Sequence, residues 1–270
     1  MEHSHTTDQR TRFYLDGNRV SPDEFTISGL DIGLLRGVNA FETARTYNGR
    51  VFRALGHAER LVQSAGTLGI DCPPVEQLSH EIECASAELE YDAKIRITLT
   101  GGGRRLIHVA PLDPEYVCKP LEVVTRIWEA PEWLGRVKHG SRAMNIATLR
   151  ATGADEVFWI GHDGCYTEAA RSSIFAAVGG VIVTPPDDGR ILQGITRKSL
   201  LDAAQVEEIP IEVRPLHHTE AMTELYATST LKQMSPVVSL DGKMGPGSGP
   251  LGQTLLSAFR RLIIRETIRE

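Results

Sequence analysis

Two residues, Lys138 and Glu168, have the types and the setting needed for chemistry on a carbonyl cofactor. Lys138 precedes the small residues Gly140 and Ser141, which would leave room for a bulky ring nearby. A lysine amine can hold a carbonyl cofactor as a Schiff base. Pyridoxal 5′-phosphate also needs a carboxylate beside its ring nitrogen, and Glu168 follows a predicted hairpin turn at 163–164. The pair therefore indicates an enzyme that uses this cofactor, with Lys138 as its catalytic residue.

The phosphate of such a cofactor needs a binding site of its own, and a later stretch of the chain offers one. Ile195 and Thr196 stand at the start of a predicted helix, where Thr196 can serve as the N-cap. A helix N-terminus presents backbone N–H groups and a positive dipole end, which suits a phosphate dianion. Ser229 and Thr230 could add hydroxyl and amide donors, and Arg60 could add a full charge. These residues are the predicted phosphate ligands.

Each of these residues also has an ordinary structural interpretation. Lys138 closely follows Arg136, so a solvated, charged surface would explain it equally well. Glu168 could pair with Arg171 at the end of a strand, and Arg60 could be an exposed arginine on a helix. The residue pattern alone leaves both interpretations open.

A glycine-rich loop ends in two adjacent arginines, Arg104 and Arg105. It is not a phosphate-binding Walker motif, because no Lys-Ser or Lys-Thr follows the glycines. A flexible turn is one interpretation. The other is a mobile lid in which the arginines bind the carboxylate of a substrate.

The composition excludes several classes of function. The chain has 270 residues, of which 41% are hydrophobic and 24% charged, as in ordinary globular proteins. Its net charge of −6 leaves no basic surplus for nucleic acid, and no apolar run reaches membrane-spanning length. The histidines form no HExxH or Cys/His cluster, so no metal site is expected, and no GxSxG indicates a serine hydrolase. The four cysteines have no paired spacing and, as free thiols, favour a cytoplasmic location.

Turn motifs and periodicity together predict an α+β fold. Short turn motifs predict β-hairpins and therefore much antiparallel sheet. They lie at residues 16–17, 48–49, 163–164, 179–180 and 241–242. Apolar residues at helical spacing predict helices over 55–68 and 251–268, and 75–90 is expected to form a more acidic helix.

The composition also suggests how the chain is divided. Residues 1–10 are expected to form a flexible tail. Residues 11–128 are predicted to form a small α+β domain, closed by strands near 106–110 and 121–128. A proline-containing stretch, 129–135, is the predicted interdomain linker. Residues 136–270 are then a large, mainly antiparallel-sheet domain that carries the lysine.

Several motifs, taken in this order, resemble the fold type IV pyridoxal-phosphate enzymes, the class-IV aminotransferases. That group includes branched-chain aminotransferases, D-amino acid aminotransferases and aminodeoxychorismate lyases. The similarity extends from Phe13 to the last helix. The matching motifs are Phe41-Glu42-Thr43, His57-Ala58-Glu59-Arg60-Leu61, Gly153-Ala154-Asp155-Glu156, Tyr166-Thr167-Glu168 and Gly194-Ile195-Thr196-Arg197.

The resemblance implies a two-domain architecture and a role for each matching residue. Lys138 would be the Schiff-base lysine and proton shuttle, and Glu168 would hold the pyridine nitrogen. Phe41 would lie near the substrate. The family is typically a homodimer. The residues implied to bind the phosphate are Arg60, Ile195, Thr196 and Thr230.

The predicted function is therefore a pyridoxal-phosphate-dependent aminotransferase that acts on a small amino acid and a 2-keto acid by a ping-pong mechanism. One alternative keeps the cofactor but eliminates pyruvate from aminodeoxychorismate. Another is a non-catalytic ligand-binding protein that kept the fold, since fold does not fix function.

Overall fold

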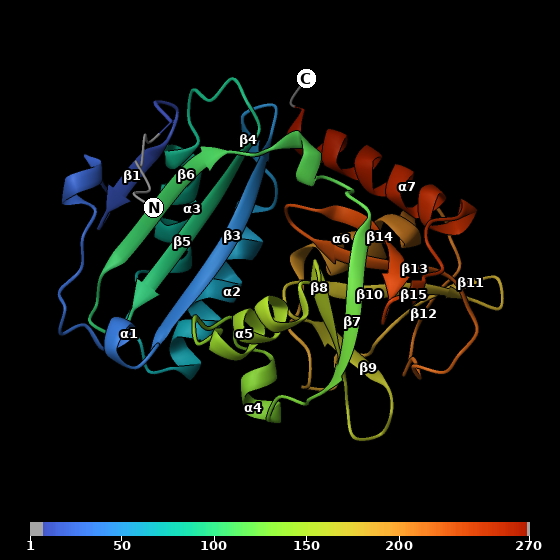
Figure 1. Cartoon of the computed structure of the whole chain (residues 1–270). Helices are drawn as coiled ribbons and strands as arrows, with labels where there is room; N and C mark the ends of the chain where they lie inside the picture. The colour runs from blue at the N-terminus through green and yellow to red at the C-terminus, as the bar shows by residue number, and fades with distance from the viewer. Residues whose placement is uncertain (1–7, 269–270) are drawn as a thin grey trace. The chain divides into compact units, whose positions relative to one another are not determined.

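All five predicted turns close β-hairpins in the computed structural model of the chain, which describes residues 8–268 (Figure 1). In the first turn both Asp16 and Gly17 have a positive φ, 52° and 87°, as a type I′ turn requires. In the third turn, at residues 163–164, only Gly164 has one, 78°. The hairpin strands are β1 (Arg12–Leu15) with β2 (Asn18–Val20), β3 (Asn39–Tyr47) with β4 (Arg50–Val51), β8 (Glu156–Ile160) with β9 (Tyr166–Ala169), β10 (Ser173–Val178) with β11 (Val181–Thr184), and β14 (Gln233–Leu240) with β15 (Lys243–Met244).

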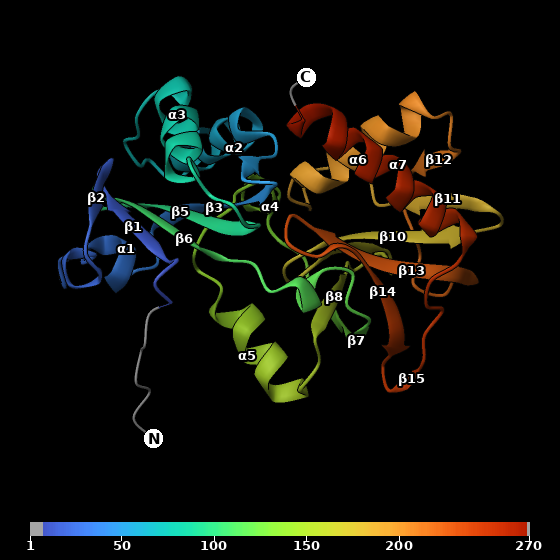
Figure 2. The ribbon, with the colours of Figure 1, turned by 90° about the horizontal axis from the view of Figure 1, so that it is seen from above.

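The first of two sheets has six strands in the order β2-β1-β6-β5-β3-β4, and every neighbouring pair is antiparallel. Two helices cover one face of this sheet (Figure 2). Alternate residues of β5, such as Ile95 and Ile97, pack with Leu61 and Leu78 of these helices in a buried core. The further elements of this part are η1 (Pro22–Glu24), α1 (Ile32–Leu35), α2 (Ala54–Thr67), α3 (Val75–Ala85), β5 (Ala93–Thr100) and β6 (Arg105–Pro111).

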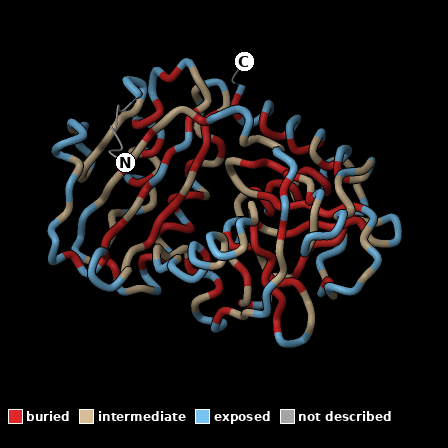
Figure 3. The backbone as a smooth tube through the Cα atoms, viewed as in Figure 1, coloured by how far each residue is buried: buried red, intermediate tan, exposed pale blue. Residues whose placement is uncertain are grey.

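The second sheet has nine strands in the order β12-β11-β10-β13-β14-β7-β8-β9, with β15 paired to β14. Most of its pairs are antiparallel, but β7 runs parallel to β14 and β8, and β11 runs parallel to β12. Helices α6 and α7 lie side by side on one face (Figure 2), and the central strands are largely buried (Figure 3). The new elements are η2 (Pro114–Tyr116), β7 (Leu121–Ile127), α4 (Glu132–Gly135), α5 (Ala143–Thr152), α6 (Ile195–Val206), β12 (Ile211–Val213), β13 (Met222–Ser229) and α7 (Pro250–Thr267). The predicted α+β class is confirmed.

The described residues group into two compact units that differ from the predicted division. The first unit runs through Asp113 and also includes Lys138–Ser141, whereas the second holds Pro114–Val137 and the chain from Arg142 onward. The strand predicted at 121–128, which is β7, therefore pairs inside the second sheet. Alternation along a strand predicts that it is a strand, but it does not say which distant strand is its partner.

Two further features concern helix α5 and the predicted N-terminal tail. Helix α5 was not predicted, because its apolar residues form no single stripe: Met144 and Ile146 are exposed, while Asn145 is buried and donates to the carbonyl of Ala170. Of the predicted tail, residues 1–7 lie outside the described part of the chain. Within the rest, Arg10 forms an ion pair with Asp8.

Candidate active site

Lys138 is held by its backbone against strand β3 and helix α2 in the first unit. Its N–H donates to the Ser64 hydroxyl at 3.0 Å, and its carbonyl accepts from the N–H of Phe41 at 2.9 Å. An isolated antiparallel bridge between Ala40 and His139 continues this contact. The Lys138 ammonium lies 4.8 Å from the centroid of the Phe41 ring. The backbone is therefore fixed at this point, and the half-buried amine lies beside an aromatic face.

The small residues after Lys138 pack closely against residues 37–41. A Cβ on Gly140 would lie 1.9 Å from the Asn39 side-chain oxygen, so this position accepts only glycine without rearrangement. The Gly140 N–H donates to the Asn39 carbonyl, and the Ser141 hydroxyl donates to the carbonyl of Gly37. The segment 138–141 is thus tied closely to residues 37–41 of the same unit.

A buried cluster of charged residues begins at the residue after Phe41. Glu42 is 0% exposed and accepts hydrogen bonds from the Arg60 guanidinium at 2.6 and 2.8 Å. Its carboxylate also contacts the His57 ring, whose Nδ1 lies 2.8 Å from Oε2, and accepts a hydrogen bond from the N–H of Thr43 at 3.2 Å. Burial opposes ionisation of Glu42, but Arg60 and His57 outweigh it and hold its pKa below the ordinary value. Burial lowers the pKa of His57. Glu42 thus fixes the guanidinium of the arginine that was predicted to bind phosphate.

The buried cluster makes a prediction about stability. We expect Arg60→Ala to lower the free energy of unfolding by about 3–5 kcal/mol, because it leaves the carboxylate of Glu42 buried without its main cation. Chemical denaturation would measure this, with the exposed Arg50→Ala as a control for charge loss in the same unit. The double variant Glu42→Leu/Arg60→Met, which removes both charges, should recover much of the loss. Equal destabilisation by the single and double variants would contradict this account.

The two loop arginines predicted to bind a substrate carboxylate are both engaged in ion pairs within the first unit. Arg104 lies 3.0 Å from Asp16, and Arg105 binds the Glu81 carboxylate with two hydrogen bonds of 2.5 and 2.9 Å. Arg105 is the first residue of β6, so its backbone belongs to the sheet. Their role toward substrate stays a prediction.

Arg96 is a candidate that sequence reasoning missed. Its guanidinium carbon lies 3.5 Å from the centroid of the Phe41 ring, so both Arg96 and Lys138 place a cation against this ring. Arg96 alternates with buried Ile95 and Ile97 along β5 and therefore projects from the face opposite the helices. This alternation was visible in the sequence, but the partner ring was not.

In the second unit, Glu168 lies on β9 and is half-buried. Its Oε2 accepts a hydrogen bond from the backbone N–H of Leu192 at 3.0 Å. Arg171, the surface partner considered for Glu168, has its guanidinium 3.8 Å from Glu156 and also donates to the carbonyl of Asp155. The hydrogen bond from Leu192 ties the candidate carboxylate to the loop that precedes α6.

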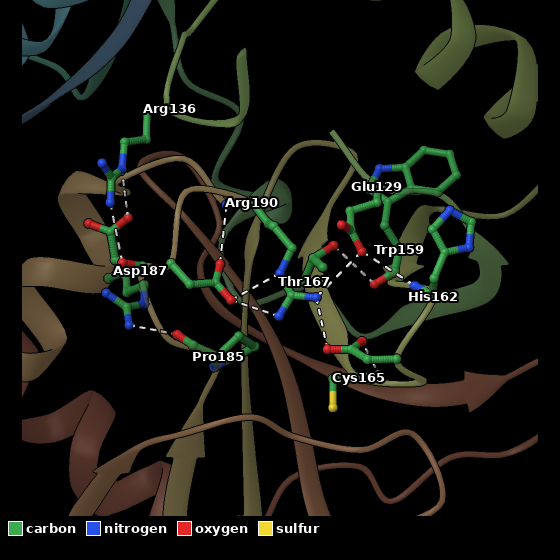
Figure 4. Close-up of polar contacts among 12 residues, drawn as sticks. Glu129, Arg136, Trp159, His162, Cys165, Thr167, Pro185, Asp187 and Arg190 are labelled. Carbon is green, nitrogen blue, oxygen red and sulfur yellow. Dashed lines mark hydrogen bonds and ion pairs between the residues drawn. The ribbon is translucent and has the colours of Figure 1, made fainter. Parts of the chain in front are cut away.

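Arg190 holds this loop through several carboxylates, as Figure 4 shows. Its guanidinium donates to Asp188 at 2.9 and 2.7 Å, to Asp163 at 2.9 Å and to Glu129 at 3.4 Å. The hydrogen bond to Asp188 is the main reason that the pKa of Arg190 is raised. These contacts join the segment before α4, the β8–β9 turn and the loop that carries Leu192. They fix the loop that supplies the N–H group to Glu168.

The predicted phosphate site begins with helix α6. The helix starts at Ile195 with Gly194 as its N-cap, and no side chain caps it, so the predicted cap by Thr196 is wrong. Thr196 is instead the second residue of the helix and is buried. The first bond of the helix ladder runs from the Lys198 N–H to the Gly194 carbonyl. The three preceding N–H groups therefore have no acceptor within the helix, as anion binding at a helix N-terminus requires.

Ser173 lies between this helix and the other predicted phosphate ligands. A Cβ on Gly194 would lie 2.7 Å from the Ser173 hydroxyl, so the start of α6 approaches β10 closely. Ser173 is paired in register with Thr228 of β13, and Ser229 and Thr230 follow at the end of that strand. The structure thus brings the start of α6 and the end of β13 to the same residue of β10, which the sequence could not predict.

The chain is similar to several known proteins. The family model described as amino-transferase class IV matches residues 39–240. The chain is 31% identical over 263 residues to a Methanocaldococcus jannaschii protein named as a provisional branched-chain-amino-acid aminotransferase, covering 86% of this chain and 89% of that one. It is 29% identical to the D-alanine aminotransferase of Staphylococcus aureus, covering 95% and 99%. The branched-chain aminotransferase of Thermoproteus uzoniensis, solved with norvaline, superposes with a TM-score of 0.84 at 25% identity, covering 94% and 95%. The chain belongs to the class IV aminotransferases.

Proposed function

We propose that this aminotransferase moves an amino group between a small amino acid and a 2-keto acid in two half-reactions. Its cofactor is pyridoxal 5′-phosphate, which class IV aminotransferases use. The observation that carries the proposal is the placement of Lys138. Hydrogen bonds from its N–H and to its carbonyl hold the backbone in place, and its ammonium group lies beside the Phe41 ring. A fixed lysine amine next to an aromatic face suits covalent attachment of the cofactor aldehyde.

The other groups that this cofactor needs are present in chemically suitable form. Glu168 supplies a carboxylate for the ring nitrogen, and its own position is fixed by the Leu192 N–H. The start of α6 with Ile195 and Thr196 supplies N–H groups for the phosphate, and Ser229 and Thr230 supply hydroxyls. Arg60 supplies a guanidinium whose orientation Glu42 fixes. When bound, the cofactor supplies an electron sink for the charge that develops at the substrate α-carbon.

Within this arrangement each residue has a definite task. Lys138 would remove the proton from the substrate α-carbon, hold it at Nζ and return it later in the half-reaction. Glu168 would hold the ring nitrogen of the bound cofactor in its protonated form. Arg96 binds the carboxylate of the amino acid, and Phe41 packs against the apolar part of the substrate. Burial of Phe41 beneath Arg96 fixes the distance between these two contacts.

The substrate class follows from this pairing of one cation with one aromatic side chain. It favours a small amino acid with an apolar side chain, which is also what the names of the relatives indicate: branched-chain amino acids and D-alanine.

We further propose a homodimer. Leu30, Leu34 and Leu35 are 82%, 60% and 57% exposed in and around α1, and several large apolar side chains exposed close together in the chain support a subunit interface there.

We also propose that the protein is located in the cytoplasm. All four cysteines are free thiols, which supports a reducing cytoplasm. None of the helices between residues 8 and 268 combines the length and apolar character needed to cross a membrane.

The half-reactions can be followed by absorbance. The purified protein is expected to be yellow, and an amino donor alone should convert the bound cofactor to its pyridoxamine form, which an added keto acid should reverse. A panel of L- and D-amino acids would identify the donor. Pyruvate release from aminodeoxychorismate without any such half-reaction would instead identify a lyase. Cofactor binding with neither reaction would indicate a ligand-binding protein.

A further inference from the structure

A pocket with a volume of about 370 Å³ lies within the second unit, and the residues assigned to the cofactor do not line it. It is formed where the turn between β13 and β14 meets the C-terminal end of α5 and the segment between η2 and β7. None of Glu168, Leu192, Thr196 or Thr230 lines it. Its volume is in the range of pockets that hold small molecules.

The walls of this pocket carry a local surplus of positive charge. Four cations, Lys119, Arg150, Arg171 and Lys232, line it together with a single carboxylate, Asp155. Glu156 lies just behind the wall and reduces the surplus to two charges. Such a surplus within a chain of net charge −6 makes the pocket a local attractor for anions.

The exposed cations are only weakly neutralised. Lys119 lies 3.2 Å from Asp155, and both side chains are partly exposed. Arg171 lies 3.8 Å from Glu156, donates one hydrogen bond to the carbonyl of Asp155 and is 51% exposed, so part of its guanidinium group faces solvent. Arg150, in the last turn of α5, forms no ion pair with any described residue. Two guanidinium groups are thus available at the rim, and guanidinium groups bind phosphate oxygens in bidentate fashion.

The floor of the pocket is rigid and charged. Lys232 is 2% exposed and donates to Glu156 at 2.6 Å and to the Ser172 hydroxyl at 3.0 Å. Glu156 is fully buried, and Ser172 donates to the same carboxylate oxygen. A charged pair buried this deeply is retained only with complete hydrogen bonding, so Lys232 occupies one fixed position. Its ammonium lies 5.9 Å from the centroid of the Tyr116 ring, which forms part of the wall.

We propose that this pocket binds a small phosphate monoester at a site separate from the cofactor. The phosphate group lies between Arg150 and Arg171, with the ammonium of Lys119 adding charge at the rim. The organic part of the ester packs against the apolar wall, which Tyr116 and Leu149 provide. Because Lys232 lies two residues after Thr230 in the same turn, the occupant contacts the turn that also carries a predicted cofactor ligand.

Calorimetric titration of the enzyme saturated with pyridoxal 5′-phosphate tests this site, because the cofactor then fills its own phosphate site. Phenyl phosphate should bind about tenfold or more tightly than inorganic phosphate, and phenol should give no measurable binding, all at fixed ionic strength. Arg150→Gln/Arg171→Gln should lower the affinity for phenyl phosphate about tenfold or more, because it removes the charge-assisted hydrogen bonds.

The matched control is Arg126→Gln/Arg265→Gln, which removes the same charge from exposed positions of the same unit outside the pocket. Its affinity for phenyl phosphate should equal that of the parent. Equal affinity in the pocket variant and the control would overturn the proposal, as would the absence of binding in the parent. Neither result bears on the amino-transfer half-reactions, which are followed by the cofactor spectrum.

Discussion

Lys138→Ala should abolish covalent retention of the cofactor and lower kcat/KM by about 10²- to 10⁴-fold, the range for a positioned acid–base group. The physical reason is that the variant removes both the amine that holds the aldehyde and the group that moves the α-proton. Its backbone should still donate to Ser64 and accept from Phe41, since these contacts do not involve the side chain. The expected defect is therefore chemical, with little change in stability.

Borohydride reduction followed by peptide mapping measures the first effect directly. The parent should carry the reduced cofactor on Lys138, and the variant should carry none. Lys94→Ala is the matched control, because Lys94 is an exposed lysine of the same unit. A label found on Lys94 or Lys119 in the parent would refute the assignment of Lys138.

Glu168→Gln should lower kcat by on the order of 10²-fold or more, while the cofactor stays bound. Glutamine keeps the volume of the side chain, and its amide oxygen can still accept the Leu192 N–H. It loses the negative charge that keeps the ring nitrogen protonated, so the substrate carbanion loses its electron sink. The visible spectrum reports cofactor occupancy, and steady-state kinetics report kcat.

The control for this experiment is Glu212→Gln, which removes an exposed carboxylate from the same unit, 53% exposed in its ion pair with Arg214. It should leave kcat unchanged. Full turnover by Glu168→Gln with bound cofactor would mean that another group serves the ring nitrogen.

Much of the local structure could be predicted because it depends on neighbouring residues. Asp-Gly and Asn-Gly pairs adopt positive φ angles at low cost, so the turns at Asp16 and Asn48 were predictable. The apolar stripe that includes Leu61 predicted α2 in the same way, since periodicity shows which face is buried. The residue types of Lys138 and Glu168, together with the motifs around them, predicted the family that the comparisons then showed.

Only the tertiary structure decided which distant residues meet. Strand β7 pairs with β14 and β8. The backbone of Lys138 is hydrogen-bonded to β3 of the first unit, and the Arg60 guanidinium is hydrogen-bonded to Glu42. The tertiary structure also placed Arg96 of β5 against Phe41 of β3, although helices α2 and α3 lie between these two strands in the sequence. These outcomes depend on which groups become buried together, because a buried charge must find a partner and a buried strand must complete its hydrogen bonds. Such requirements apply to residues far apart in the chain, and no local pattern states how they are met.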